Sequence, residues 1–187
     1  EQQATWGTTM VMDVKTGDLL AMVNLGETAP KSGVYYEKEN YALSRRIEPG
    51  STFKLMSLLA LTEDCGLPIT QEYQTHHGNK VEVGYKGPKV EDDHDIGGMV
   101  DMKTATAQSS NVYFAESIYE NYKSNKARYH KFLTEELHLG QMLGFEAMEE
   151  VKPKIHDPKD WSAATLPNMG YGYGFDIPPI RTLVLYN

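Results

Sequence analysis

The sequence has only one cysteine, Cys65, among its 187 residues. No disulfide can form within the chain, so cysteine usage does not indicate whether the protein works in an oxidising or a reducing compartment. We expect Cys65 to be a buried structural thiol.

Long apolar runs are also missing, since none approaches the roughly 18 residues that a membrane-spanning helix needs. The start, Glu1-Gln2-Gln3, has no signal-peptide pattern, and the chain stops inside a helical pattern near Asn187, so we expect a piece of a longer protein.

Basic residues are scarce as well. Lysine and arginine total 18 against 26 acidic residues, for a formal net charge of -8. Such a chain repels polyphosphate, which argues against a nucleic-acid partner. Its 40% hydrophobic and 24% charged residues are ordinary for a globular protein with a core. We therefore expect one domain over residues 1–187.

The hydropathy pattern predicts an antiparallel hairpin followed by helices. Apolar and small residues alternate from Trp6 to Val14, a turn-like segment follows, and Leu19 to Val23 forms a second apolar run. Residues 25–48 show no regular pattern. Residues 51–64 are apolar on nearly every face, which is typical of a central buried helix.

The remaining segments complete an α+β prediction in which helices pack on an antiparallel sheet. The rest of the chain is assigned as follows: short strands within 70–98, helices from Met99 or Val100 to Gln108, from Val112 to about Tyr122 and from Ala127 to Leu137, a long proline-interrupted loop over 146–168, and a final helix from Ile180. Tyr129, Phe132, Leu133 and Leu137 recur at helical spacing and are expected in the core.

The first candidate chemical element is Ser51-Thr52-Phe53-Lys54, after the helix-breaking Pro49-Gly50. Residues three apart on a helix share a face, so the Lys54 ammonium is expected near the Ser51 hydroxyl. A serine needs a neighbour that accepts its proton, and a desolvated lysine with a lowered pKa can do so. The alternative is that Ser51 is only a helix N-cap. Two features of Lys54 argue against a simple cap. It occupies the position where a capping box has glutamate or glutamine. Its positive charge is also unfavourable in the first turn of a helix, where the helix dipole is positive.

The second element is Ser109-Ser110-Asn111, which lies between two helical segments. Ser109 could relay a proton and Asn111 could orient a substrate beside Ser51 and Lys54. Taken alone, three polar residues between helices are most often a cap. The two elements occur once each and in this order, which favours a joint function.

Together these elements resemble a known family. Ser-x-x-Lys, Ser-x-Asn and Lys-Thr-Gly are the signature of penicillin-binding proteins and class A β-lactamases. Residues 48–54 are similar to the acylation motif of class B penicillin-binding proteins, and residues 108–111 to their second motif. The opening hairpin, Gly170-Tyr171-Gly172 and Ile177-Pro178-Pro179 are similar to further parts of the transpeptidase domain.

The resemblance implies a β-lactamase/transpeptidase-like fold with a helical subdomain, and a peptidoglycan D,D-transpeptidase without cofactor or metal. Its catalytic residues would be Ser51, Lys54, Ser109 and Asn111, with Lys54 favoured but not established as the acylation base. The implied partners are peptidoglycan stem peptides, β-lactams and other cell-wall synthesis proteins. Family members work on the outer face of the cytoplasmic membrane, anchored by an N-terminal helix that this sequence does not contain.

The third motif departs from the family pattern. Lys15-Thr16-Gly17 matches it literally but precedes Ser51, and its position predicts a hairpin turn. No Lys-Thr-Gly or Lys-Ser-Gly follows Asn111. We therefore expect the C-terminal strands to be missing and the piece to be weakly active, since losing one oxyanion-hole donor costs on the order of a hundredfold in rate.

Other functions fit the sequence less well. The histidines and the acidic run Asp92-Asp93-His94-Asp95 fit no metal template, and a solvated polar loop explains them better. Gly170 to Gly174 lacks the context of a nucleotide-binding loop, and backbone packing explains its glycines. A β-lactamase would need a group that activates water for deacylation, and the class A arrangement, a Glu-x-x-x-Asn segment after Ser109, is matched only by Glu116 to Glu120, which ends in the wrong residue. A slowly deacylating enzyme is therefore favoured, while a β-lactamase, a β-lactam sensor and a non-catalytic scaffold of the same fold stay open.

Overall fold

The structure is a computed structural model that describes residues 4–145 and 149–187. The described chain forms two compact units. One unit comprises residues 4–47, 139–145, 149–154 and 176–187, and the other comprises residues 48–138 and 155–175. None of the helices within the described residues is both long and apolar enough to cross a bilayer.

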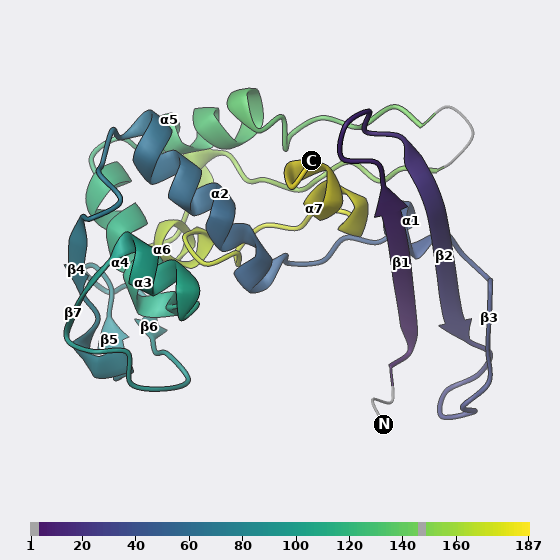
Figure 1. The fold of residues 1–187 in the computed structure, drawn as a ribbon, viewed down its shortest axis with the longest axis horizontal. Coiled ribbons are helices and arrows are strands. Elements are labelled where there is room, and N and C mark those ends of the chain that lie inside the picture. The colour runs from purple at the N-terminus through teal and green to yellow at the C-terminus, as the bar shows by residue number, and fades with distance from the viewer. Residues whose placement is uncertain (1–3, 146–148) are drawn as a thin grey trace. The chain divides into compact units, whose positions relative to one another are not determined.

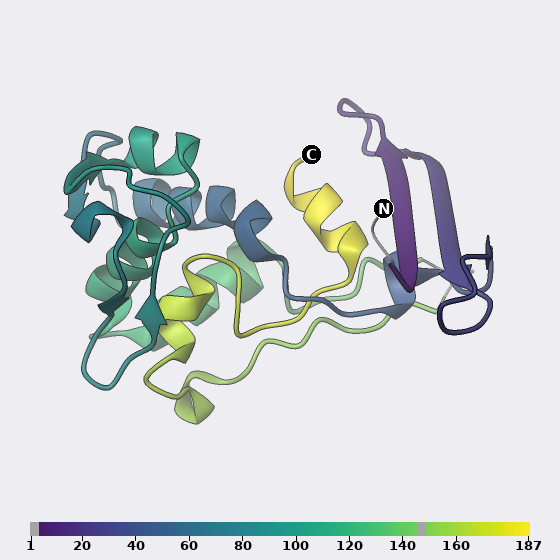
Figure 2. The same ribbon diagram turned by 90° about the horizontal axis from the view of Figure 1, so that it is seen from below.

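The first unit is built on a three-stranded antiparallel sheet in the order β1-β2-β3, whose long hairpin is plain in Figures 1 and 2. Met10 pairs with Met22, and the register shifts between Val11 and Met12. The elements of this unit are β1 (Trp6–Met12), β2 (Leu19–Glu27), β3 (Tyr35–Tyr36), α1 (Tyr41–Ser44) and α7 (Pro179–Leu185). The predicted hairpin and final helix are thus confirmed.

The turn of this hairpin contains the early Lys-Thr-Gly sequence. The Asp13 carboxylate accepts hydrogen bonds from the backbone N–H groups of Lys15 (2.8 Å) and Thr16 (2.9 Å), and Gly17 has φ of 75°. These are the interactions of an Asx-type turn. The prediction that Lys15-Thr16-Gly17 is turn chemistry is confirmed.

The absence of regular structure predicted for residues 25–48 is wrong. β2 continues to Glu27 and pairs there with β3, while α1 follows. The side chain of Asn24 joins these parts: its amide donates to Asn40 Oδ1 (3.2 Å) and its oxygen accepts from Ala42 N–H (3.0 Å). A buried asparagine satisfied by segments 16 and 18 residues away leaves no periodic signal in the sequence.

The second unit is mainly helical and carries the candidate site. Its elements are a 3-10 turn η1 (Gly50–Phe53), α2 (Lys54–Leu59), a π-helical turn η2 (Ala60–Asp64), β4 (Glu72–Gln74), the 3-10 turn η3 (His76–Gly78), β5 (Val81–Glu82), β6 (Lys89–Val90), β7 (Met99–Asp101), α3 (Met102–Ala107), α4 (Asn111–Tyr122), α5 (Lys126–Lys131), a π-helical turn η4 (Phe132–Glu136), the 3-10 turn η5 (Pro158–Asp160) and α6 (Thr165–Met169). Strand β4 pairs with β7, and β5 with β6, both antiparallel. Helices with antiparallel strands confirm the α+β class.

The core of this unit centres on α4 as well as on α2. On α4 the residues Val112, Tyr113, Phe114, Ala115, Ile118 and Tyr122 are buried. The helix predicted over residues 51–64 forms as η1, α2 and η2, and it buries Phe53, Met56, Ala60 and Leu61, whereas Leu55, Leu58 and Leu59 are half-buried. Tyr129, Phe132 and Leu133 are buried as predicted, but Leu137 is only half-buried.

Three further expectations need correction. Residues 99–101 form a strand because Val100 pairs with Tyr73, and the helix begins at Met102, where the Asp101 side chain caps it by accepting from Thr104 N–H (2.8 Å). The predicted loop contains η5 and α6; Pro167 lies in the first turn of α6, where no N–H is required. Cys65 is half-buried and not buried. The part of the loop over 146–148 lies outside the described residues.

Candidate active site

Ser51 lies in the first turn of its helix but does not cap it. The N-cap position is Pro49, with no side-chain cap, and the Ser51 carbonyl accepts a hydrogen bond from the Lys54 N–H. The N-cap alternative for Ser51 is therefore wrong. The Ser51 side chain is exposed, and within the described residues its hydroxyl makes no hydrogen bond. An exposed hydroxyl in this position is open to an incoming substrate.

A backbone contact with the glycine-rich segment supports this turn. Gly50 N–H donates to the Gly172 carbonyl at 2.9 Å, and a Cβ at Gly172 would lie 1.9 Å from the Gly50 carbonyl oxygen. The φ of Gly172 is 91°, which also favours glycine. The prediction that backbone packing explains the glycines of this segment is confirmed for Gly172 and for Gly170, where a Cβ would lie 2.4 Å from the Phe114 carbonyl oxygen, whereas a Cβ at Gly174 would meet nothing closer than 3.8 Å.

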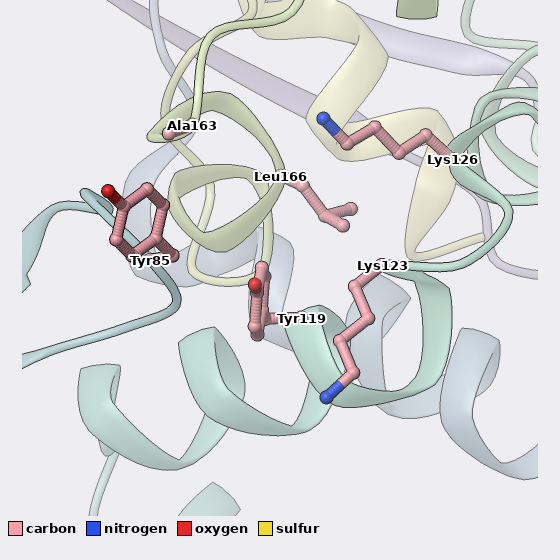
Figure 3. A pocket seen from close by; sticks show the side chains of 6 residues that line it. All are labelled: Tyr85, Tyr119, Lys123, Lys126, Ala163 and Leu166. Atoms are coloured by element: carbon pink, nitrogen blue, oxygen red, sulfur yellow. The ribbon is translucent and has the colours of Figure 1, made fainter.

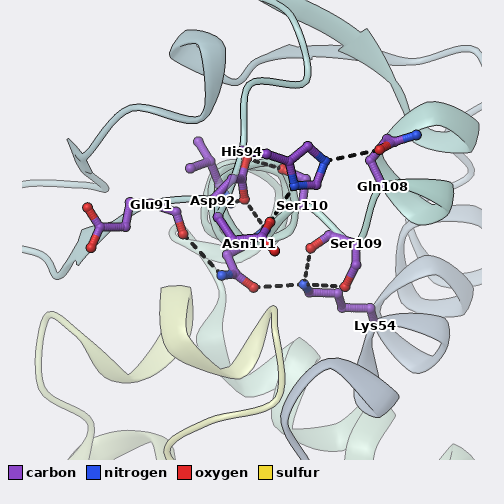
Figure 4. A network of polar contacts seen from close by, with 10 residues as sticks. Lys54, Glu91, Asp92, His94, Gln108, Ser109, Ser110 and Asn111 are labelled. Atoms are coloured by element: carbon purple, nitrogen blue, oxygen red, sulfur yellow. Dashed lines mark hydrogen bonds and ion pairs between the residues drawn. The ribbon is translucent and has the colours of Figure 1, made fainter.

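Lys54 is the buried cation of the site, with a side chain only 4% exposed. Its ammonium donates to the Ser109 carbonyl (2.5 Å), to Ser109 Oγ (3.0 Å) and to Asn111 Oδ1 (2.7 Å), as Figure 4 shows. A lysine ammonium has three N–H donors, so these acceptors satisfy it completely. The two candidate elements, 55 residues apart in the sequence, therefore meet at the Lys54 nitrogen.

Burial strongly affects the charge of Lys54. Desolvation lowers its pKa from the ordinary 10.5 to about 8, while the carboxylates of Asp92 and Asp93 act in the opposite direction. Desolvation outweighs the carboxylates, because the charged form loses hydration that neighbouring carboxylates only partly replace. Close to neutral pH, Lys54 thus has an appreciable neutral fraction that can accept a proton.

The Ser109-Ser110-Asn111 turn serves both as a cap and as a ligand for Lys54. Ser110 is buried and is the N-cap of α4, with its hydroxyl accepting from Tyr113 N–H at 2.9 Å. Ser109 has φ of 55°, an unusual conformation for a residue other than glycine. The capping alternative is therefore right for Ser110 alone, whereas Ser109 and Asn111 contact Lys54.

The structure brings Lys54, Ser109 and Asn111 together but does not bond Lys54 to Ser51. Among residues 4–145 and 149–187, the side-chain hydrogen bonds of Lys54 all go to the Ser109-Ser110-Asn111 turn. A charged Lys54 has no donor left for Ser51, and a neutral Lys54 has two N–H groups and a lone pair. Loss of the proton therefore leaves the lysine nitrogen able to accept.

One important residue, Asp92, was missed by the sequence reasoning. Its carboxylate accepts from Asn111 N–H (2.5 Å), Val112 N–H (3.1 Å) and the Ser110 hydroxyl (2.9 Å). The interpretation of residues 92–95 as a solvated loop is wrong for Asp92, which is half-buried. The partners lie 18 to 20 residues further along the chain, so no local pattern could have identified them.

The same loop contributes His94, which links it to the end of α3. Its ring nitrogens contact Asp93 Oδ1 (2.5 Å) and Gln108 Oε1 (3.0 Å). Figure 4 shows the contact with Gln108. These contacts raise the pKa of His94, with the Gln108 hydrogen bond as the largest cause and Asp93 next. In the part of the chain that the structure describes, no group of three histidine, cysteine or acidic side chains is arranged to hold a metal.

A separate cavity of about 220 Å³ in this unit contains none of the four predicted catalytic residues. Figure 3 shows its lining: Tyr85, Tyr119, Lys123, Lys126, Ala163 and Leu166. The Lys123 ammonium bonds to Glu120 at 2.6 Å. The cavity is thus separate from the cluster around Lys54.

The arrangement around Lys54 has the features of one class of protein. A serine and a lysine three residues apart on one helix, and a Ser-x-Asn turn on the lysine, are two of the three signature elements of the penicillin-binding and class A β-lactamase enzymes. The family described as "Penicillin binding protein transpeptidase domain" matches residues 7–186. The chain belongs to this family, as its resemblance to class B penicillin-binding proteins implied.

Similar proteins agree with this assignment. Penicillin-binding protein PbpB of Mycobacterium tuberculosis (strain ATCC 25618 / H37Rv) is 28% identical over 182 residues, which are 95% of this chain and 26% of PbpB. A structure of penicillin-binding protein 3 from Mycobacterium tuberculosis, complexed with aztreonam, matches with a TM-score of 0.77 and 24% identity over 97% of this chain and 40% of that one.

A peptidoglycan glycosyltransferase structure from Burkholderia ambifaria matches with a TM-score of 0.78 and 23% identity, over 98% of this chain and 52% of that one. The structural matches establish the fold. The chain spans about a quarter of PbpB and about half or less of these two structures.

Proposed function

We propose that this chain contributes the nucleophile and its proton acceptor to a D,D-transpeptidase that cross-links peptidoglycan. The observation that supports this most directly is the buried Lys54 nitrogen, held by Ser109 and Asn111 one helical turn from the exposed Ser51. Membership of the transpeptidase family supports a peptidoglycan stem peptide as the substrate, and we infer that this peptide ends in D-Ala-D-Ala. β-Lactams would acylate the same serine.

In the acylation step, Ser51 Oγ attacks the carbonyl carbon of the penultimate D-alanine. Neutral Lys54 takes the serine proton, directly or through the Ser109 hydroxyl 3.0 Å away. The C–N bond then breaks, the proton passes to the leaving nitrogen, and the last D-alanine departs. An amine of a second strand attacks the ester, restores Ser51 and completes the cross-link.

Asn111 has the chemistry of a substrate-orienting group. Its oxygen accepts from Lys54, and its amide nitrogen donates to the Glu91 carbonyl at 3.0 Å. A side-chain amide has a second N–H, which can donate to a substrate carbonyl. This arrangement couples the position of the substrate to the position of Lys54.

We infer the cellular setting from what the family resemblance implies. A transpeptidase for peptidoglycan works on the outer face of the cytoplasmic membrane, together with other cell-wall synthesis proteins, in division or in maintenance of cell shape. The protein would be held there by an N-terminal membrane anchor.

Covalent labelling of the full-length protein with a fluorescent penicillin tests the proposal. We expect a stable fluorescent band and a mass increase on the peptide that contains Ser51, and Ser51→Ala should abolish both. Thr52→Ala removes the neighbouring hydroxyl of the same turn and is the matched control, which should retain the label.

The other outcomes would contradict either the assignment of Ser51 or the transpeptidase function. Labelling that persists in Ser51→Ala would refute Ser51 as nucleophile. An unlabelled wild-type protein that is folded would support the non-catalytic scaffold. A label that forms and is quickly lost by hydrolysis would support a β-lactamase.

A further inference from the structure

Asp92 holds the start of α4 through three hydrogen bonds. One carboxylate oxygen accepts from the backbone N–H groups of Asn111 (2.5 Å) and Val112 (3.1 Å), and the other accepts from the Ser110 hydroxyl (2.9 Å). Backbone N–H groups at a helix N-terminus have no partner within the helix, and a carboxylate there is also favoured by the helix dipole. Asp92 therefore determines where the first turn of α4 lies.

Asn111 is the residue that this interaction places. The loop holds it at two points, since Asp92 binds its backbone N–H and the Glu91 carbonyl accepts from its side-chain amide at 3.0 Å (Figure 4). The remaining amide oxygen accepts from Lys54 at 2.7 Å. The chain of contacts thus runs from Asp92 through Asn111 to the Lys54 nitrogen.

We propose that Asp92 is a positioning residue for acylation, which holds Asn111, and through it Lys54, in the geometry that accepts the Ser51 proton. The proposal rests on the transpeptidase function proposed above. Asp92 itself touches neither Ser51 nor Lys54 by hydrogen bond within the described residues, so it acts through Asn111. It lies outside both motifs.

The negative charge of Asp92 has a second effect on Lys54. Asp92 and Asp93 both raise the pKa of Lys54 through space against the larger effect of burial, whereas the hydrogen-bond partners of the ammonium, Ser109 and Asn111, are uncharged. Asp93 hydrogen-bonds to His94, and within the described residues it makes no hydrogen bond to the start of α4. The two acidic residues therefore share the electrostatic effect, but only Asp92 has the positioning role.

This difference permits a matched experiment on the full-length protein. The second-order rate constant of acylation by a fluorescent penicillin is measured across pH for the wild type, Asp92→Asn, Asp93→Asn and Asp95→Asn. Asp95 is exposed on the same loop and bonds to Gly97 N–H and His77, so it is the control for charge removal alone.

For Asp92→Asn we expect two changes. The rate on the high-pH plateau should fall on the order of tenfold to a hundredfold, because small misplacements of catalytic groups cost that much. The midpoint of the pH profile should also move to lower pH. Asp93→Asn should move the midpoint with little change in the plateau, and Asp95→Asn should change neither.

Ser110→Ala separates positioning from helix stability. This variant also weakens the start of α4, but it keeps the Asp92 charge and its bonds to Asn111 and Val112. Its midpoint should equal that of the wild type, and its plateau should fall less than that of Asp92→Asn. Thermal unfolding of every variant shows whether the rates belong to folded protein. If Asp92→Asn is unfolded, Asp92→Glu takes its place. This variant keeps the negative charge, so its plateau should fall while the midpoint of its pH profile stays at the wild-type value.

The inference is overturned if Asp92→Asn, folded, is acylated with the plateau of the wild type, or if Asp93→Asn or Ser110→Ala lowers the plateau equally. Failure of the transpeptidase proposal itself looks different, because the wild type would then not be acylated at Ser51 at all.

Discussion

The pKa of Lys54 gives a quantitative prediction about acylation. Burial lowers this pKa from 10.5 to about 8. At about pH 7.5 a lysine with a pKa of about 8 is roughly 24% neutral, whereas one with a pKa of 10.5 is about 0.1% neutral, a difference of roughly 200-fold in the available base. The fold therefore gives Lys54 the neutral fraction that its proposed role as base requires.

The sign of the pH dependence follows from the role of the neutral form. A base acts when it has lost its proton, so the acylation rate should rise with pH through a midpoint near 8 and then level off. Rates of acylation by a fluorescent penicillin, measured from about pH 6 to 10 under single-turnover conditions, test this expectation.

Lys54→Arg tests the same point by substitution. A guanidinium retains its proton throughout this range, so the variant keeps a positive charge but lacks a neutral form. We expect its acylation rate at about pH 7.5 to fall on the order of a hundredfold or more. Lys103→Arg, at an exposed position of α3, is the control and should match the wild type. A midpoint near 10.5, a flat profile, or a Lys54→Arg variant with the wild-type rate would refute Lys54 as the base.

Three further substitutions test the packing that supports the site. Gly172→Ala should lower the free energy of unfolding by at least about 2 kcal/mol, since the new Cβ would collide with the Gly50 carbonyl and the φ is unfavourable, and urea denaturation measures this loss. Ser110→Ala should cost about 1 kcal/mol in the same assay, because the N–H of Tyr113 loses its cap. Phe53→Ala should cost about 3–5 kcal/mol, because Phe53 is only 1% exposed and its truncation leaves a cavity next to the turn that carries Ser51.

Gly66 provides the control for Gly172. Its φ is 69°, but a Cβ there would meet nothing within 4 Å. Gly66→Ala should therefore cost only the conformational part, on the order of 1 kcal/mol. Equal losses for the two glycine variants would contradict the proposed collision with Gly50. A Ser110→Ala variant as stable as the wild type would contradict the capping role of Ser110.

Local chemistry explains why much of the fold could be predicted. The β1–β2 hairpin is visible as a period of two around a turn that needs glycine, and the helix after Pro49-Gly50 is visible as an apolar run. These features depend on neighbours within a few residues. Residues 99–101 were mistaken for helix because their strand conformation depends on a partner, Tyr73, that lies far away in the sequence.

The catalytic candidates, too, were partly predictable from local sequence and partly decided by the tertiary structure. Spacing and motif order identified Ser51, Lys54, Ser109 and Asn111 as one group, and the structure brings the last three into contact. It also assigns Ser110 to capping, a distinction that depends on which side chain turns toward α4 and which toward Lys54. That choice follows from the unusual backbone of Ser109 and not from residue type.

The sequence by itself determined the residue types, their order and the family resemblance, because these are properties of short segments. Only the tertiary structure decided that Lys54 is desolvated, that its hydrogen bonds go to Ser109 and Asn111 and not to Ser51, and that Asp92 holds α4 in place. The physical reason is that desolvation and long-range hydrogen bonds depend on segments that meet only after folding.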